Sequence, residues 1–254
     1  ELSFLSKEWQ SGGTITGNMN LSFPFSNAFS SAIDLDMRFQ LSDFDLMVPD
    51  YDLDFQSIEG EGGFYLPHHL SGDFQGKLFD EKISIKALSD RNSLKFALEG
   101  IADTKMINVV TELSIEDHLE GSFEYFAEMV FATNATNQSN FRLETSLEGM
   151  TVNLPLPFFK KQKEITEFKV NIDFDGDKEF VYLSYADHDL FLTTKEMEII
   201  NGAIALSGKT LPNDLPLNNG LVIGDLEVIN LADYSDLINA SEPLDIFWEL
   251  KDLQ

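Results

Sequence analysis

Hydrophobic and polar residues alternate along most of this chain with a period of two, the pattern of strands that have one apolar and one solvated face. The clearest run occupies residues 33–41, where the apolar positions are Ile33, Leu35, Met37, Phe39 and Leu41. A one-residue change of phase at Ser42 and Asp43 predicts a β-bulge, after which Phe44, Leu46 and Val48 resume the alternation. The sequence therefore predicts a long strand, bent once, with a single apolar face.

Similar short runs follow one another between segments rich in Gly, Asn and Asp, which favours an antiparallel meander. The predicted strands cover residues 14–25, 51–55, 64–66, 70–79, 83–87, 94–98, 123–131, 141–147, 168–174, 190–192, 197–206 and 221–228, and a further strand is predicted to begin at residue 180 or 181. The glycine-rich segments 9–13 and 60–63 are predicted turns, and Asp175-Gly176-Asp177-Lys178 predicts a tight hairpin because Asp-Gly tolerates positive φ.

Two segments depart from this period. Met106, Val109, Val110 and Leu113 have helical spacing, so residues 105–113 are a predicted amphipathic helix with Asp103 or Thr104 as its N-cap. A second short helix is predicted over residues 231–238. The fold class is mainly β, a long antiparallel sheet with one or two short helices, organised as one elongated unit over residues 1–254 with possible sub-modules 1–102, 103–212 and 213–254.

Charge and composition limit the partners. The chain has 44 acidic and 17 basic residues and a net charge of -27, which repels nucleic acid. It has no cysteine, so disulfides, thiolate catalysis and cysteine-bound zinc are excluded. It begins at Glu1 and carries neither a signal peptide nor an apolar segment long enough to span a membrane. We expect a fragment of a larger protein whose membrane anchor lies outside it.

Catalytic and metal-binding patterns are missing from the sequence. Asp173, Asp175 and Asp177 suggest a calcium loop, but the positions that need Gly and Glu hold Lys178 and Ser184, so a hairpin is the better interpretation. The other aspartates fall on the polar phase of strands, where a solvated face explains them better than acid/base catalysis. The adjacent His68 and His69 would point to opposite faces of a strand. We predict a protein that is not an enzyme and needs no metal or cofactor.

The apolar face has two interpretations that periodicity alone leaves open. In a closed sandwich or barrel it is an ordinary core, whereas in an open trough it is a channel for acyl chains, which gain about 0.8 kcal/mol per buried CH₂. The candidate lining residues are Leu35, Met37, Phe39, Leu41, Leu53, Phe55, Phe96, Leu98, Phe123, Tyr125, Leu143, Leu147, Val152, Leu154, Phe168, Val170, Ile172 and Phe174.

One segment carries a family resemblance. In residues 146–161, Leu147, Val152 and Leu154 are predicted to face one side of a strand that ends at Pro155 and Pro157. Its pattern Ser-Leu-x-Gly-Met, then Leu-Pro-x-Pro-Phe-x-Lys, resembles the AsmA-like proteins of the YhdP type. Residues 218–234, with Asn218, Gly220-Leu221-Val222-Ile223 and Leu231-x-Asp233-Tyr234, resemble the same family, although Tyr234 stands where that family often has Trp.

This resemblance implies a curled, taco-like β-groove in the periplasm, attached to the inner membrane, that carries phospholipid between inner and outer membranes. Phospholipid acyl chains would be the partners, and the acidic outer face would keep the groove soluble. The alternative is a periplasmic or secreted β-sandwich binding or adhesin-like module that recognises a glycan or protein on its acidic face. An outer-membrane barrel fits less well because several strands are short and helices interrupt them.

Overall fold

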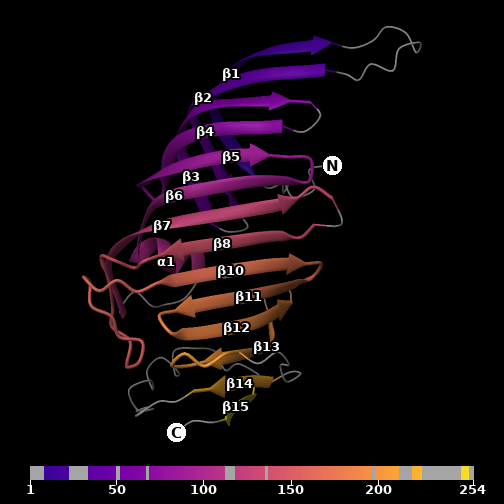
Figure 1. Cartoon of the computed structure of the whole chain (residues 1–254). Helices are drawn as coiled ribbons and strands as arrows, with labels where there is room; N and C mark the ends of the chain where they lie inside the picture. The colour runs from indigo at the N-terminus through magenta and orange to yellow at the C-terminus, as the bar shows by residue number, and fades with distance from the viewer. Residues whose placement is uncertain are drawn as a thin grey trace. The chain divides into compact units, whose positions relative to one another are not determined.

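The computed structural model describes residues 9–22, 34–49, 52–66, 69–111, 118–134, 137–195, 198–211, 219–224 and 247–251, and these are almost entirely β-strand (Figure 1). The fold class predicted from the sequence is confirmed. The strands are β1 (Gln10–Ser22), β2 (Asp34–Val48), β3 (Leu53–Tyr65), β4 (His69–Leu78), β5 (Glu81–Ser89), β6 (Ser93–Asp103), β7 (Leu119–Ala132), β8 (Ser139–Thr145), β9 (Met150–Val152), β10 (Phe168–Asp175), β11 (Lys178–Tyr185), β12 (His188–Lys195), β13 (Glu198–Ala205), β14 (Asn219–Ile223) and β15 (Phe247–Lys251).

The chain divides into two compact units, which are described separately. The first comprises Glu1–Ser114 and Tyr125–Asn137, and the second Ile115–Glu124 and Gln138–Gln254. Strand β7 therefore contributes its first residues to the second unit and the remainder to the first. The sub-modules predicted from the sequence stay a prediction.

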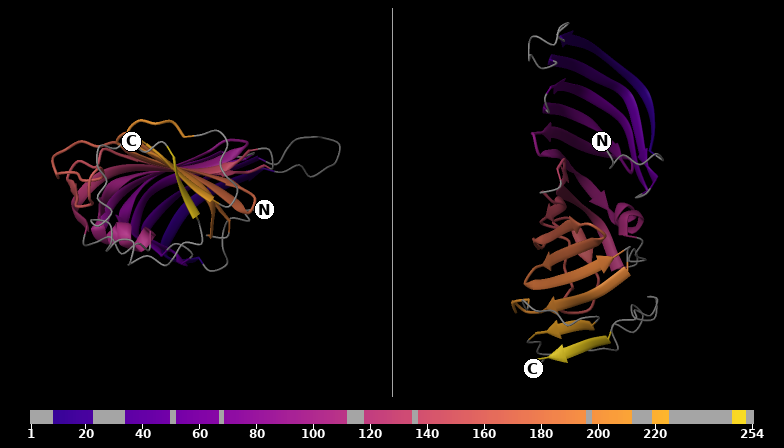
Figure 2. Two further views of the ribbon diagram at one scale, coloured as in Figure 1. Left: turned by 90° about the horizontal axis from the view of Figure 1, so that it is seen from below. Right: turned by 90° about the vertical axis from the view of Figure 1, so that its right-hand side faces the viewer.

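In the first unit, β1 to β6 form an antiparallel meander in which each strand pairs with its neighbours in sequence. The pairing slips at two places: around Asp43, where β2 has one residue more than β1 and β3, and around Ser57, where β3 has one residue more than β2 and β4. Asp43 has a φ of 52°, which confirms the bulge predicted there. Because a bulge bends its strand and increases its twist, these two bulges curve the first strands of the unit (Figure 2).

Both glycine-rich turns predicted from the sequence are wrong. Residues 10–13 belong to β1, and Gly60 to Gly63 lie within β3. Glycine favours turns when a segment is considered alone. In this sheet, however, the glycines of β3 make room for side chains of the neighbouring strands, which a single-strand pattern does not reveal.

In the second unit, the ladder order is β8, β10, β11, β12, β13, β14 and β15. The predicted hairpin is confirmed, because Asp175 pairs with Lys178 around Gly176, whose φ is 64°. The last two pairings, β13 with β14 and β14 with β15, are parallel, so the prediction of an antiparallel sheet fails at this end. Short β9 pairs with the beginning of β7.

The helix predicted after residue 103 is confirmed as α1 (Thr104–Thr111). Its N-cap is Asp103, whose Oδ1 accepts a hydrogen bond of 2.9 Å from the Met106 backbone N–H. The predicted helix at residues 231–238 lies outside the described residues. No helix within the described part of the chain has the length and apolarity needed to cross a membrane.

Candidate functional site

The apolar positions of the first unit share one face of the sheet because the strand registers align them in rows. One row runs Gly17, Phe39, Gly62, Gly72, Ala87, Phe96, and the next runs Ile15, Leu41, Gly60, Phe74, Ile85, Leu98. Burial follows the same alternation, since along β4 the even positions Phe74 and Leu78 are buried and the odd positions are exposed. The predicted lining residues Leu35, Met37, Phe39, Leu41, Phe96 and Leu98 all fall on this face.

Large side chains on this face lie beside glycines of the next strand. The Phe39 ring of β2 covers Gly62 of β3, where a Cβ atom would lie 2.8 Å from Cε2 and 2.9 Å from Cε1 of the ring. Phe39 stacks with Phe74 of β4, their centroids 6.2 Å apart, so the two rings meet across β3. The Phe74 ring in turn covers Gly72. Because the rings lie along the sheet instead of standing up from it, they form a smooth aromatic surface.

The centre of this face is well packed and its edge is open. Ile58, Phe74 and Ala87 form a buried cluster, against which further apolar residues pack: Phe39, Leu41, Phe44, Leu46, Phe55, Leu70, Ile85 and Phe96. On β1, by contrast, Ile15, Met19 and Leu21 are 60%, 62% and 50% exposed. Leu53 precedes Phe55 by two positions on β3 and therefore shares its face.

Tyr125 introduces a polar group into this apolar face. The side chain is 6% exposed, and its hydroxyl has no hydrogen-bond partner. The Tyr125 hydroxyl oxygen lies 3.0 Å from the position that a Cβ of Gly100 would occupy. Tyr125 of β7 therefore lies on the same side of the sheet as the apolar side chains of β6. Burial raises the pKa of Tyr125 to about 12. Phe131, six residues further along β7 and so on the same face, packs edge-on against Phe96.

The second unit repeats the arrangement. Leu143, Val170 and Leu183 form one cross-strand row, and Phe141, Ile172 and Val181 form the next. Phe168 and Phe174 lie on the same face of β10, as predicted. Phe123, on the first part of β7, is 7% exposed.

The prediction that Leu147, Val152 and Leu154 share one strand is wrong. Strand β8 ends at Thr145, Leu147 has a φ of 49° and Gly149 a φ of 98°, so the chain turns between them. A Cβ at Gly149 would clash with the Ser122 carbonyl oxygen, so only glycine allows this close approach to β7. Val152 is buried on the separate strand β9, and Leu154 lies in the loop that follows.

The proline-containing loop after β9 folds back on the unit. Lys160 is 1% exposed, and its Nζ donates hydrogen bonds to the carbonyl oxygens of Met150, at 2.8 Å, and Lys161, at 3.1 Å. Burial lowers the pKa of Lys160, an effect that Glu164 and Glu148 oppose. The Phe158 carbonyl accepts a hydrogen bond of 2.8 Å from the Tyr185 hydroxyl. The family-like Pro-x-Pro-Phe-x-Lys segment is therefore a packed structural element.

On β11 to β13 of the second unit, the opposite face also carries apolar residues, which the sequence analysis missed. The Phe191 ring stacks on Phe180, with centroids 6.4 Å apart, and packs against Tyr182, with centroids 4.6 Å apart. These three side chains lie on the face opposite the row of Val181 and Leu192. Ala203, also on this opposite face, is fully buried. The signal was the continuous run Phe180-Val181-Tyr182-Leu183, which is typical of a strand that is apolar on both faces.

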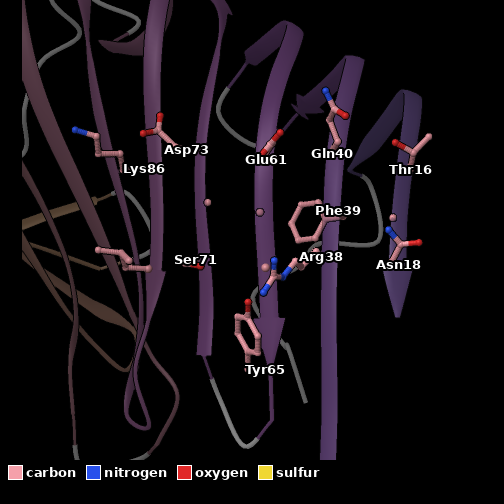
Figure 3. Close-up of a pocket in the computed structure, with 15 residues that line it drawn as sticks. Thr16, Asn18, Arg38, Phe39, Gln40, Glu61, Tyr65, Ser71, Asp73 and Lys86 are labelled. Atoms are coloured by element: carbon pink, nitrogen blue, oxygen red, sulfur yellow. The ribbon is translucent and has the colours of Figure 1, made fainter. Parts of the chain in front are cut away.

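The polar face of the first unit carries a hollow of about 880 Å³ (Figure 3). Side chains of β1 to β5 line it, among them Arg38, Glu61, Tyr65, Asp73 and Lys86. These are the polar positions of the alternation, so the hollow lies on the face opposite the aromatic surface. Nothing in the sequence analysis predicted it.

Two units of mostly antiparallel sheet, each with cross-strand rows of apolar residues and with little helix among the described residues, define the class of this protein. Residues 3–246 match the family described as YhdP protein, and the chain therefore belongs to the YhdP family. This confirms the resemblance found in the sequence. Comparison with curated proteins and with solved structures gave no match.

Proposed function

We propose that this chain is a segment of a hydrophobic groove that carries phospholipid between the inner and outer membranes and so supports outer-membrane lipid homeostasis. In this proposal the segment lies in the periplasm and is attached to the inner membrane through a part of the protein outside this chain. The observation that carries it is the cross-strand row structure of the apolar face, repeated in both units. Membership of the YhdP family, which resembles bridge-like lipid-transfer proteins, supports it.

The energetics suit a moving lipid. An acyl chain of about 14 methylenes that is half buried on such a face gains on the order of 5 kcal/mol. The smooth floor made by Phe39 and Phe74 over the glycines of β3 and β4 offers apolar area without a deep pocket that would hold one lipid in place. Contact of this kind favours binding along the face over tight binding at one point.

Within the described ranges, no group of three or more His, Asp or Glu residues is arranged to hold a metal ion. Apart from β9, the described strands follow one ladder order, whereas the sandwich alternative needs two sheets packed face to face.

The test uses the exposed edge of the apolar face, where a substitution costs little stability. Met19, 62% exposed on β1, begins the row that continues through Met37 and Phe64. We expect Met19→Asp to reduce the phospholipid that the delipidated protein takes up from phosphatidylethanolamine and phosphatidylglycerol vesicles, measured by native mass spectrometry. The matched control is Asn18→Asp, which adds the same charge to the other face of the same strand. Wild-type protein that takes up no phospholipid, or equal uptake by the two variants, would refute the proposal.

A further inference from the structure

The hollow on the polar face of the first unit follows from the strand registers. The middle row of the hollow is Gly17, Phe39, Gly62 and Gly72. The three glycines have no side chain, and the Phe39 side chain points toward the apolar face. The two flanking rows point into solvent and form its walls. One wall is Asn18, Arg38, Gly63, Ser71 and Leu88, and the other is Thr16, Gln40, Glu61, Asp73 and Lys86. The hollow crosses five strands, a length of about 19 Å at the usual strand spacing.

An aromatic ring lies on one side of its floor. Gly63 is buried, and a Cβ there would lie 3.1 Å from Cε2 of Tyr65 and 3.5 Å from its hydroxyl oxygen. The Tyr65 ring therefore lies back along β3 over Gly63, flat against the sheet. Figure 3 shows Arg38 reaching from β2 toward the same part of β3. A flat ring beside hydrogen-bonding side chains offers a stacking surface with polar groups at its rim.

The charges of the hollow balance. Arg38 and Lys86 face Glu61 and Asp73, so the lining has equal numbers of cationic and anionic groups in a chain whose net charge is -27. A polyanion needs a surplus of cations, and a metal ion needs converging oxygen ligands without cations beside them. The uncharged polar side chains of the lining are hydroxyls and amides, which both donate and accept hydrogen bonds, and the other lining residues are glycines, Phe39 and Leu88. This set matches an uncharged ligand rich in hydroxyl groups.

We propose that the hollow binds a neutral oligosaccharide, with one sugar ring stacked on Tyr65 and the hydroxyls of neighbouring sugars paired with Arg38, Glu61, Asp73 and Gln40. The elongated hollow suits a chain of sugar rings laid across the strands. This site is on the opposite face from the proposed lipid groove and does not depend on it.

The experiment is isothermal titration of the whole chain with cellotetraose and with chitotetraose. Binding of at least one is expected, and Tyr65→Ala should weaken it about tenfold, the loss of one aromatic stacking contact. Tyr65→Phe keeps the ring and should bind like the wild type. Arg38→Ala should also weaken binding, whereas Lys77→Ala, on the polar face of β4 but outside the hollow, is the matched control and should not.

Three results would overturn the proposal: no binding of either sugar up to about 10 mM, equal weakening by Tyr65→Ala and Lys77→Ala, or displacement of the bound sugar by inorganic pyrophosphate. Met19→Asp should leave sugar binding unchanged, so the lipid and sugar proposals fail independently.

Discussion

Gly62 tests whether the aromatic surface depends on glycine. In Gly62→Ala the new Cβ would lie 2.8 and 2.9 Å from two atoms of the Phe39 ring and closer still to Cζ, so the ring must move. Displacement ends the stacking of Phe39 on Phe74, worth about 0.5–1.5 kcal/mol. Re-exposing roughly 40 Å² of ring costs about 1 kcal/mol more. Replacing glycine with alanine also lowers the conformational entropy of the unfolded chain, which stabilises the protein by about 0.4–1 kcal/mol. The net loss of stability is therefore about 1–2 kcal/mol.

The assay is urea unfolding followed by far-UV circular dichroism, in a double-mutant cycle with Phe39→Ala. Without the ring, Gly62→Ala should stabilise the protein by about 0.5 kcal/mol, which gives a coupling energy of about 2 kcal/mol. Gly12→Ala is the matched control, because a Cβ at Gly12 has no atom within 4 Å. If Gly62→Ala is equally destabilising with and without the Phe39 ring, the ring does not occupy the space above Gly62 and the reasoning is wrong.

Three further predictions concern single side chains. Tyr125→Phe should stabilise the protein by about 1 kcal/mol at neutral pH, because it removes a buried hydroxyl without a partner. The pKa of Tyr125 is raised to about 12 in the folded protein, so between about pH 10 and 12 this tyrosine ionises only in the unfolded chain. The wild type should therefore lose stability as pH rises through that range. Urea titrations should show a smaller loss for Tyr125→Phe. Lys160→Met should cost about 1–2 kcal/mol, because the Met150 carbonyl loses its hydrogen bond from Lys160, whereas the Lys161 carbonyl keeps the one from the Glu164 backbone N–H. Since burial lowers the pKa of Lys160, the wild type should gain stability relative to this variant as pH rises from that lowered pKa toward the unfolded value of 10.5. Asp103→Ala should cost about 1 kcal/mol in thermal unfolding and Asp103→Asn much less, because asparagine still caps the helix.

Local patterns in the sequence were enough for much of the fold. The alternation in residues 33–41 predicted the apolar face of β2, the change of phase at Asp43 predicted its bulge, and Asp103 predicted the start of α1. Each of these depends on interactions within a few residues of one segment. For the same reason the Asp175 to Lys178 hairpin was predictable.

Features that depend on a neighbouring strand were not predictable. Gly60 to Gly63 resembles a turn until the register places Phe39 over Gly62. The turn at Leu147 depends on the close approach of Gly149 to Ser122, which lies on another strand. The hollow on the polar face required the registers of five strands at once. That the predicted lining residues contact lipid stays a prediction.

The pairing of large side chains with glycines links the fold to the proposed function. Other glycines are covered by a neighbouring side chain in the way that Phe39 covers Gly62. A Cβ at Gly76 would lie 3.1 Å from the Ile58 side chain, and a Cβ at Gly100 would lie 3.0 Å from the Ile83 side chain. Each glycine leaves space in which a side chain of a neighbouring strand can lie against the backbone. The apolar face therefore continues from strand to strand. A side chain forced upright would interrupt that surface. Gly62→Ala should therefore also reduce phospholipid uptake at urea-free conditions where the protein stays folded, whereas Gly12→Ala should not. Unchanged uptake in a folded Gly62→Ala protein would mean that the lipid does not travel over Phe39.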